Sequence, residues 1–223
     1  IFVLIAWLPA WLIATVLRQT VSLAVSLQVL TLMSLLAVVM LYVLYPNMGE
    51  LWREPLDIMV QQLAEQSTDF TLAELKQTED WVIAFLPGLF ASSIMFGTML
   101  SLFLGRWWQA VFYNPGGFGK EFRSLNLGKV AALCAMALML IAATVDSVFA
   151  VAMVTVVFVL YGIQALSLLH AAIKIRQINA AWLFLIYLIM FFVPHVLLLL
   201  MLASFADPWL DIRQRIGQVA DKT

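Results

Sequence analysis

The sequence predicts an all-α, polytopic transmembrane helix bundle with six spans and one external amphipathic helix. Its composition is the first reason, because 64% of the 223 residues are hydrophobic and only 11% are charged. Soluble domains contain about 45–50% apolar and about 25% charged residues. The second reason is that the apolar runs are continuous over the roughly 20 residues a membrane helix needs, rather than alternating as in barrel strands.

Six apolar runs are expected to be helices, because only helices and closed barrels satisfy every backbone group in lipid. They cover residues 1–17, 21–45, 81–104, 130–145, 147–169 and 180–206. The fourth and fifth runs are separated by a short turn, which predicts a tight helical hairpin. The first run has no initiator Met and no signal-peptide features, so the native protein is expected to contain at least one helix upstream. The helix bundle is therefore expected over residues 1–206, with a tail at 207–223.

The loops on the two sides of the predicted bundle differ in charge. Lys and Arg in short loops mark the cytoplasmic side of a membrane protein. The first, third and fifth connections hold seven cations and one acid, a net charge of +6, whereas residues 46–80 hold eight acids and two bases, a net charge of −6. We therefore expect loop 105–129 in the cytoplasm, and both segment 46–80 and the tail outside.

The external segment is expected to contain two helices. The first covers residues 50–66 and has four apolar side chains near one face: Leu51, Ile58, Met59 and Leu63. It is interpreted either as a helix lying on the membrane surface or as a lid over the bundle. Thr71 and Glu74 form a capping-box pattern, which predicts a helix that starts at Thr71 and continues into the third span. Pro87 is expected to bend that helix.

Small residues recur at every fourth position in two of the spans. The third span has Ser93, Gly97, Ser101 and Gly105, and the first span has Ala6, Ala10 and Ala14. Small residues at this spacing allow another helix to approach closely in lipid. We interpret them as helix-packing residues, either within this chain or between it and a membrane-protein partner or a second copy.

Three polar residues at mid-depth are candidates for ligand binding. His195 follows Pro194 in the sixth span, and Tyr161 and Gln164 lie in the fifth. Ionisable and polar groups inside a bilayer face the bundle interior and often mark functional sites. We therefore predict that His195 faces the interior or a wet cavity, with Tyr161 or Gln164 as its partner.

The sequence gives no sign of catalysis, of a metal or other cofactor, or of nucleic-acid binding. It has no acidic pair within a span and no His-Glu-x-x-His or Gly-x-Ser-x-Gly motif. Cys134 is the only cysteine, two histidines are too few for a histidine-rich metal centre, and the net charge of −1 offers no basic surface to phosphates. The partner that the composition does predict is the lipid bilayer.

Three segments together resemble the YybS-like family of bacterial membrane proteins, whose function is unknown. They are the acidic segment leading into a Pro-containing span (72–87), the loop with Asn114-Pro115-Gly116-Gly117-Phe118 and Glu121-Phe122-Arg123, and the tail 206–213. The resemblance covers residues 51–215 and implies a bacterial inner-membrane location. The family is distantly similar to the substrate-binding S components of energy-coupling-factor transporters, in which an Ala-x-x-x-Ala pattern docks the coupling subunit. The resemblance thus implies docking through Ala6, Ala10 and Ala14, although an S component has both termini in the cytoplasm.

These observations favour a non-enzymatic membrane protein that binds a small or lipid-like ligand, as a subunit of a transporter. The alternative is a structural or assembly protein that acts through the third span and the external segment. A lipid-processing enzyme is the third hypothesis.

Overall fold

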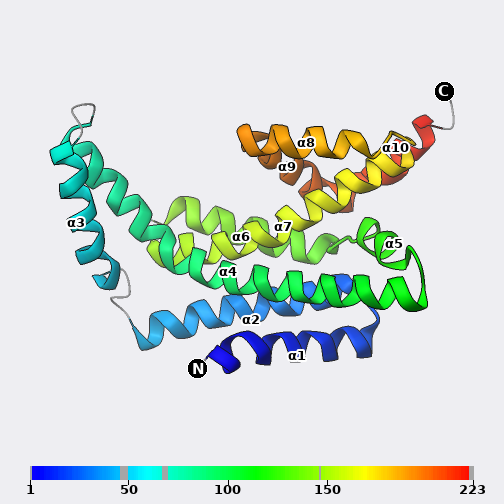
Figure 1. Ribbon diagram of the computed structural model, residues 1–223, viewed down its shortest axis with the longest axis horizontal. Helices are drawn as coiled ribbons and strands as arrows, with labels where there is room; N and C mark the ends of the chain where they lie inside the picture. Colours follow the sequence, from blue (N-terminus) through cyan, green and yellow to red (C-terminus); the bar gives the residue numbers. More distant parts are fainter. Residues whose placement is uncertain (1, 46–49, 67–69, 146, 221–223) are drawn as a thin grey trace.

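The computed structural model describes residues 2–45, 50–66, 70–145 and 147–220. These residues form helices joined by short connections and contain no strand, so the prediction of an all-α fold is confirmed for them. The helices shown in Figure 1 are α1 (Phe2–Thr20), α2 (Leu23–Leu44), α3 (Glu50–Gln66), α4 (Leu72–Tyr113), α5 (Gly117–Arg123), α6 (Gly128–Thr144), α7 (Val148–Ile175), α8 (Ala181–Phe192), α9 (His195–Leu210) and α10 (Ile212–Ala220).

The main bundle is formed by α1, α2, α4, α6 and α7, which run lengthwise beside one another (Figure 1). Helix α7 lies at its centre and packs against α2, α4, α6 and α9. The core contains Ile13, Leu27, Met95, Met99 and Val156, all with 1% or less of their surface exposed. The turn between α6 and α7 is short, so the predicted helical hairpin is confirmed.

Helices α4 and α7 cross in close contact at Gly88. A Cβ atom on Gly88 would lie 2.7 Å from the Cα of Ala152 and 2.8 Å from its carbonyl oxygen. The Cβ of Thr155 would be 3.0 Å away. Only a residue without a side chain allows the two backbones this approach, so Gly88 sets the distance between the two longest helices.

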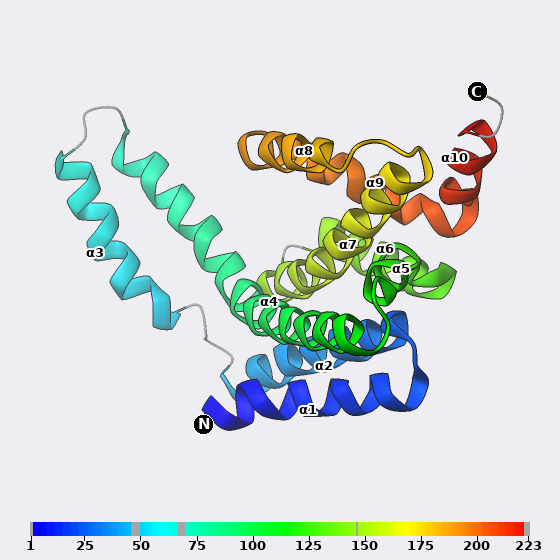
Figure 2. The same ribbon diagram turned by 45° about the vertical axis from the view of Figure 1, so that its right-hand side comes forward.

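The acidic segment folds as a helical hairpin of α3 and the start of α4, which projects away from the bundle in Figures 1 and 2. The predicted capping box is confirmed: Thr71 Oγ1 accepts from the Glu74 N–H, and the Glu74 carboxylate accepts from the Thr71 N–H. Figure 1 shows α4 changing direction in its first half, which contains Pro87.

Two ion pairs connect α3 to α4 in this hairpin. Arg53 Nη1 lies 3.1 Å from Asp80, and Lys76 Nζ lies 2.9 Å from Asp57. The hydrogen bond from Lys76 lowers the pKa of the Asp57 carboxyl, whereas burial and the nearby Asp57 charge raise the pKa of Glu79. The four apolar residues predicted to form one face of α3 remain exposed. Helix α3 packs against α4 around Val60 instead.

The six predicted spans are not all present as single helices. By length and composition, α2, α4 and α7 could each cross a membrane, and the number rises to five if the bent pairs α5–α6 and α8–α9 are each counted as one span. The span expected at residues 180–206 is divided into α8 and α9, whose axes differ by 112°. Pro194 explains the break, because it has no N–H to continue the hydrogen bonds of α8.

The break also changes the side on which the chain ends. Helix α8 leaves the end of the bundle where α7 finishes, and α9 returns to that end (Figures 1 and 2). Arg213 of α10 donates hydrogen bonds to the carbonyl oxygens of Arg123 and Leu125 in the predicted cytoplasmic loop. The expectation that the tail lies opposite this loop is therefore wrong, since α8 and α9 together do not cross the bundle.

Candidate functional site

A buried stretch of non-helical backbone connects α5 to α6. Leu125 and Leu127 are each 3% exposed, although residues 125–127 are not in a helix. Gly128 has a φ of +78°, which lets α6 begin in a new direction that a residue with a side chain would adopt only under strain. Non-helical backbone inside an apolar bundle is tolerated only where other protein groups satisfy it.

Two glutamines satisfy both backbone groups of Leu127. Gln28 of α2 donates to the Leu127 carbonyl at 2.6 Å, and Gln164 of α7 accepts from the Leu127 N–H at 3.0 Å. The amide of Gln164 also donates to the Ser204 carbonyl of α9 at 2.6 Å. Gln164 is fully buried, so its side chain joins α7, α9 and the α5–α6 connection in one polar network.

Arg213 provides the second set of contacts to the same connection. Its Nε lies 3.0 Å from Asp207, whose side chain is 1% exposed. The guanidinium also donates to the Arg123 and Leu125 carbonyls and to Ser167 Oγ. Asp211 adopts a left-handed conformation with φ of +46° and ends α9, which turns the chain so that α10 returns Arg213 to Asp207.

The three predicted ligand-binding residues do not converge. Tyr161 is buried and stacks on Phe205, with ring centroids 3.7 Å apart. The Tyr161 hydroxyl has no hydrogen-bond partner among the described residues. Tyr161 also lines a cavity of about 150 Å³ between α2, α6 and α7. His195 is exposed at the start of α9 and makes no hydrogen bond to Tyr161 or Gln164. The expected His195 partnership is therefore wrong, because the break at Pro194 carries His195 away from α7. Ligand binding by these three residues stays a prediction.

The small residues of α4 do not pack against another helix as expected. Ser93, Gly97, Ser101 and Gly105 are all exposed. A Cβ on Gly97 or Gly105 would meet no described atom within 4 Å. The two serine hydroxyls bond to carbonyls of their own helix. The interpretation of this ladder as packing within the chain is wrong, since α7 crosses α4 on the face that carries Gly88.

The two predicted small-residue patterns do meet in one groove. Ala10 and Ala14 of α1 and Ser101 and Gly105 of α4 line a hollow of about 620 Å³, with Arg18 and Arg106 at one end. Arg106 is paired with Glu121, at 2.6 Å. The Ala6 side chain lies outside the described part of the chain. This groove offers a surface of small side chains to a ligand or to another helix.

A second hollow, of about 340 Å³, lies between α1, α2 and α4 nearer the external end. Pro9, next in sequence to Ala10, lines it, so the two hollows follow one another along α1 and α4. Most of its lining is apolar and includes Met33, Met40 and Met95. Its two lining hydroxyls, of Ser34 and Thr98, bond to carbonyls of their own helices and so require no polar ligand.

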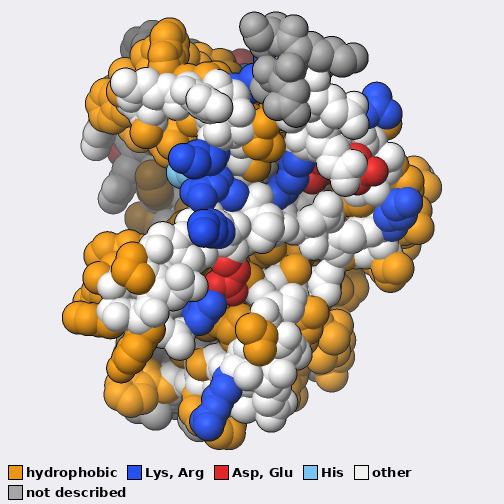
Figure 3. All heavy atoms as spheres, turned by 90° about the vertical axis from the view of Figure 1, so that its right-hand side faces the viewer, with side chains coloured by type: hydrophobic (Ala, Val, Ile, Leu, Met, Phe, Trp, Pro, Cys, Tyr) orange, Lys and Arg blue, Asp and Glu red, His pale blue; other side chains and the backbone are white. Residues whose placement is uncertain are grey.

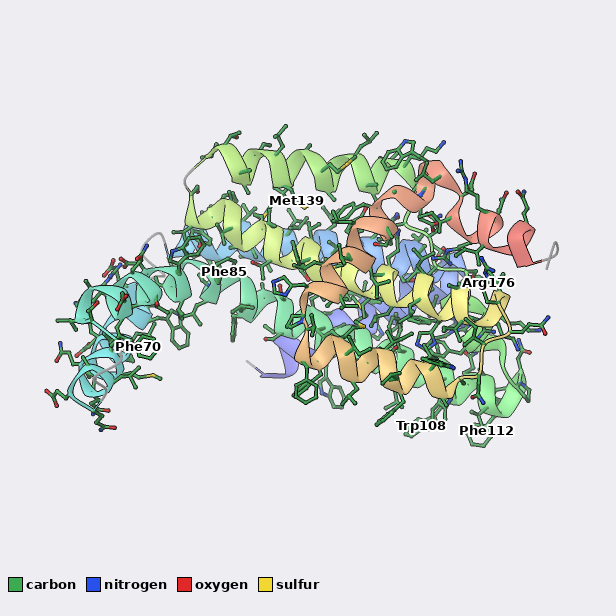
Figure 4. The ribbon with its side chains drawn as sticks, turned by 90° about the horizontal axis from the view of Figure 1, so that it is seen from above. Phe70, Phe85, Trp108, Phe112, Met139 and Arg176 are labelled. Carbon is green, nitrogen blue, oxygen red and sulfur yellow. The ribbon has the colours of Figure 1, made fainter. Side chains whose placement is uncertain are left out.

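Cations gather at the end of the bundle where α4, α7 and α9 finish. Figure 3 looks at this end and shows the blue Lys and Arg side chains around its middle. Figure 4 shows Arg176 at the same end and Phe70 at the opposite one, with Trp108 and Phe112 pointing away from the helices. The last two side chains are 57% and 78% exposed, as expected for aromatic residues at a membrane interface.

Sequence reasoning missed four members of the polar network. Ser167 and Ser204 are isolated hydroxyls in apolar runs, and Asp207 and Arg213 lie six residues apart across the end of a helix. The sequence did contain one indication of the network: Ser167 follows Gln164 by one helical turn, which places both side chains on one face of α7. No comparable pattern links Asp207 to Arg213, because their pairing depends on the reversal at Asp211.

No family model matches the sequence, and no curated protein or solved structure is similar to it. The likeness to YybS-like proteins therefore stays a prediction. Within the described residues, no three His, Cys, Asp or Glu side chains lie together in a way that could hold a metal ion.

Proposed function

We propose that this chain is a non-enzymatic integral protein of the bacterial inner membrane that binds a lipid-like ligand, as the binding subunit of a transporter. The proposal rests on the apolar hollow between α1, α2 and α4. Its volume of about 340 Å³ is at the lower end of the range of about 300–1,000 Å³ typical of ligand sites. Because its polar atoms are already bonded, an acyl chain suits the hollow better than a polar solute.

Methionine side chains support this choice of ligand. Three of them line the hollow, and their unbranched thioethers adapt to flexible apolar partners of differing shape. Along α1 the hollow is followed by the groove between α1 and α4, whose lining includes Arg18. A lipid with its chain in the hollow would place its head group toward this charged end of the bundle.

Two tryptophan substitutions test the site. Ala37 lines the hollow and is exposed, so Ala37→Trp fills it without replacing a core residue. Leu36, which is 59% exposed and does not line the hollow, gives the control Leu36→Trp. In native mass spectra of protein released from lipid nanodiscs, Ala37→Trp should lose the most strongly retained lipid. The control should keep it. Equal retention by both variants would contradict a ligand site between these helices.

The charge distribution supports a cytoplasmic position for the basic end, and labelling can test it. On a Cys134→Ser background, Asn114→Cys and Gln218→Cys should both resist an impermeant thiol reagent added to intact cells. Gln62→Cys in α3 should react. Labelling of Asn114→Cys from outside would reverse the proposed orientation, and different behaviour of Asn114→Cys and Gln218→Cys would contradict the shared side of loop and tail.

The second candidate function is assembly with another membrane protein or a second copy through the groove between α1 and α4. Its specific support is that two residues of each small-residue pattern line this groove, Ala10 and Ala14 of α1 and Ser101 and Gly105 of α4, and that the α4 ladder is exposed. Gly105→Leu should then abolish a co-purifying protein or a dimer without lowering thermal stability, because no described atom lies within 4 Å of the new Cβ. Unchanged complexes with Gly105→Leu would exclude this groove as the contact.

A further inference from the structure

A third hollow, of about 380 Å³, lies at the basic end, where α5, α7 and α10 meet. Four cationic side chains line it: Lys120, Arg123, Lys174 and Arg213. The hydroxyl of Ser124 belongs to the same lining, and none of the described lining residues is acidic. Four cations from three helices thus surround one hollow, although they are far apart in the sequence.

Two nearby acids, Asp207 and Glu121, are already in ion pairs. Asp207 is paired with Arg213, and Glu121 is paired with Arg106 at 2.6 Å. Among the described residues, no ion pair involves Lys120, Arg123 or Lys174. The hollow therefore keeps a net charge of +3 after Asp207 is counted against Arg213. Like charges around one hollow repel each other, and a bound anion relieves that repulsion.

Arg213 is held in place by its hydrogen bonds, whereas the two lysines are exposed. Arg213 uses four of its five N–H donors on Asp207, Ser167 and two carbonyls. Arg123 lies over the backbone of Gly119, where an added Cβ would come within 3.0 Å of its Nη1. Lys120 and Lys174 are exposed, so they can move to meet a ligand at the rim.

We propose that this hollow binds a phosphate monoester or diester. Guanidinium and ammonium groups are the usual ligands of phosphate oxygens, and basic pockets between helices on the cytoplasmic side bind anionic head groups. The exposed aromatic residues at the end of α4 place the hollow at head-group depth. The phosphate can belong to a membrane lipid or to a soluble ester. This site uses α5, α7 and α10 and does not depend on the ligand proposed between α1, α2 and α4.

The test compares two pairs of charge-neutralising substitutions at the same end of the bundle. Lys120→Gln with Lys174→Gln removes the two mobile cations of the hollow. Lys129→Gln with Arg176→Gln removes two exposed cations that do not line it. Both double variants change the net charge equally, and neither touches the Gln164 or Arg213 network, so thermal melting should leave both folded.

Binding is measured in nanodiscs with two classes of probe. Phosphatidylglycerol in a phosphatidylcholine background tests the lipid source, and glycerol 1-phosphate added to pure phosphatidylcholine nanodiscs tests the soluble source. For whichever probe binds, the Lys120/Lys174 variant should bind about 25-fold more weakly, or about fivefold for each lysine, which corresponds to about 1 kcal/mol per cation. The Lys129/Arg176 variant should stay within about twofold of the unaltered protein, since neither of its side chains reaches the hollow.

Loss of phosphatidylglycerol binding by the Lys120/Lys174 variant alone would support a lipid head-group site. Loss of glycerol 1-phosphate binding by that variant alone would support a soluble phosphate ester. Equal weakening by both double variants would show a diffuse charge effect and overturn the proposal. The proposal would also be overturned if neither probe bound to the unaltered protein.

Discussion

Gly88→Ala is expected to destabilise the protein, because α7 leaves no room for a side chain at this position of α4. The new methyl carbon would lie 2.7 and 2.8 Å from the backbone of Ala152 and 3.0 Å from the Cβ of Thr155. These distances are about 1 Å or less inside the ordinary carbon–carbon separation of about 3.5–4.0 Å. Two of the three atoms are backbone, so the clash cannot be relieved by rotation of a flexible side chain.

The magnitude follows from two opposing effects. Inserting a methyl group into a well-packed contact costs about 1–3 kcal/mol. Replacing Gly by Ala inside a helix contributes about 0.8–1.0 kcal/mol in the opposite direction. The net loss in the free energy of unfolding should therefore be about 0–2 kcal/mol, and the larger value is expected because α4 and α7 must separate along their whole contact.

Gly97→Ala and Gly105→Ala in the same helix are matched controls. Each adds the same methyl group where no described atom lies within 4 Å, so only the helix-propensity gain should remain. Thermal unfolding in detergent, followed by tryptophan fluorescence, should rank the controls at or above the unaltered protein and Gly88→Ala below it. A Gly88→Ala protein as stable as Gly97→Ala would refute the contact between α4 and α7.

Three further changes test the polar network and the external hairpin. Gln164→Leu should cost about 1–3 kcal/mol in unfolding experiments, because the buried N–H of Leu127 loses its acceptor; an unaffected melting temperature would contradict the network. Arg213→Gln should lower the free energy of unfolding by about 3–5 kcal/mol, because it leaves the buried Asp207 without its ion-pair partner. The double variant Arg213→Gln/Asp207→Asn should regain part of this loss. If it regains none, the loss does not come from the unpaired charge. Glu79→Gln should increase protection of α3 from proteolysis at pH 7. Burial raises the pKa of the Glu79 carboxyl, which means that the folded state favours the protonated form. The stability that comes from this protonation is lost as the pH rises through the raised pKa. The advantage of Glu79→Gln should disappear in mild acid, and an equal advantage at both pH values would contradict this assignment.

Several elements could be predicted because they depend on neighbouring residues in the chain. Thr71 and Glu74 specify the start of α4 through hydrogen bonds within one helical turn. The turn between α6 and α7 interrupts an apolar run that is too long for one span. Pro194 correctly predicted an interruption of the helix, but a proline in the sequence does not specify the angle between the helices on its two sides. The 112° change between α8 and α9 depends on how the two helices pack, so the sequence predicted neither the division of the sixth run into two helices nor the exposed position of His195.

The glycines of α4 illustrate the same limit. Gly97 and Gly105 belong to the predicted pattern, yet both are exposed, whereas Gly88, outside that pattern, contacts the backbone of α7. A repeat at every fourth residue identifies one face of a helix but does not identify the helix that covers it. The choice between packing within the chain and packing against a partner therefore required the position of α7.

The sequence by itself determined that the chain is helical, strongly apolar and divided into a basic and an acidic end. These properties follow from composition and from the hydrogen-bonding needs of each backbone segment, which are local. The tertiary structure alone decided that the tail returns to the basic loop, that Arg213 meets Asp207, and that four cations surround one hollow. Each of these contacts joins residues whose separation depends on the direction of the intervening helices. The break at Pro194 and the turn at Asp211 set those directions through packing that no local pattern encodes.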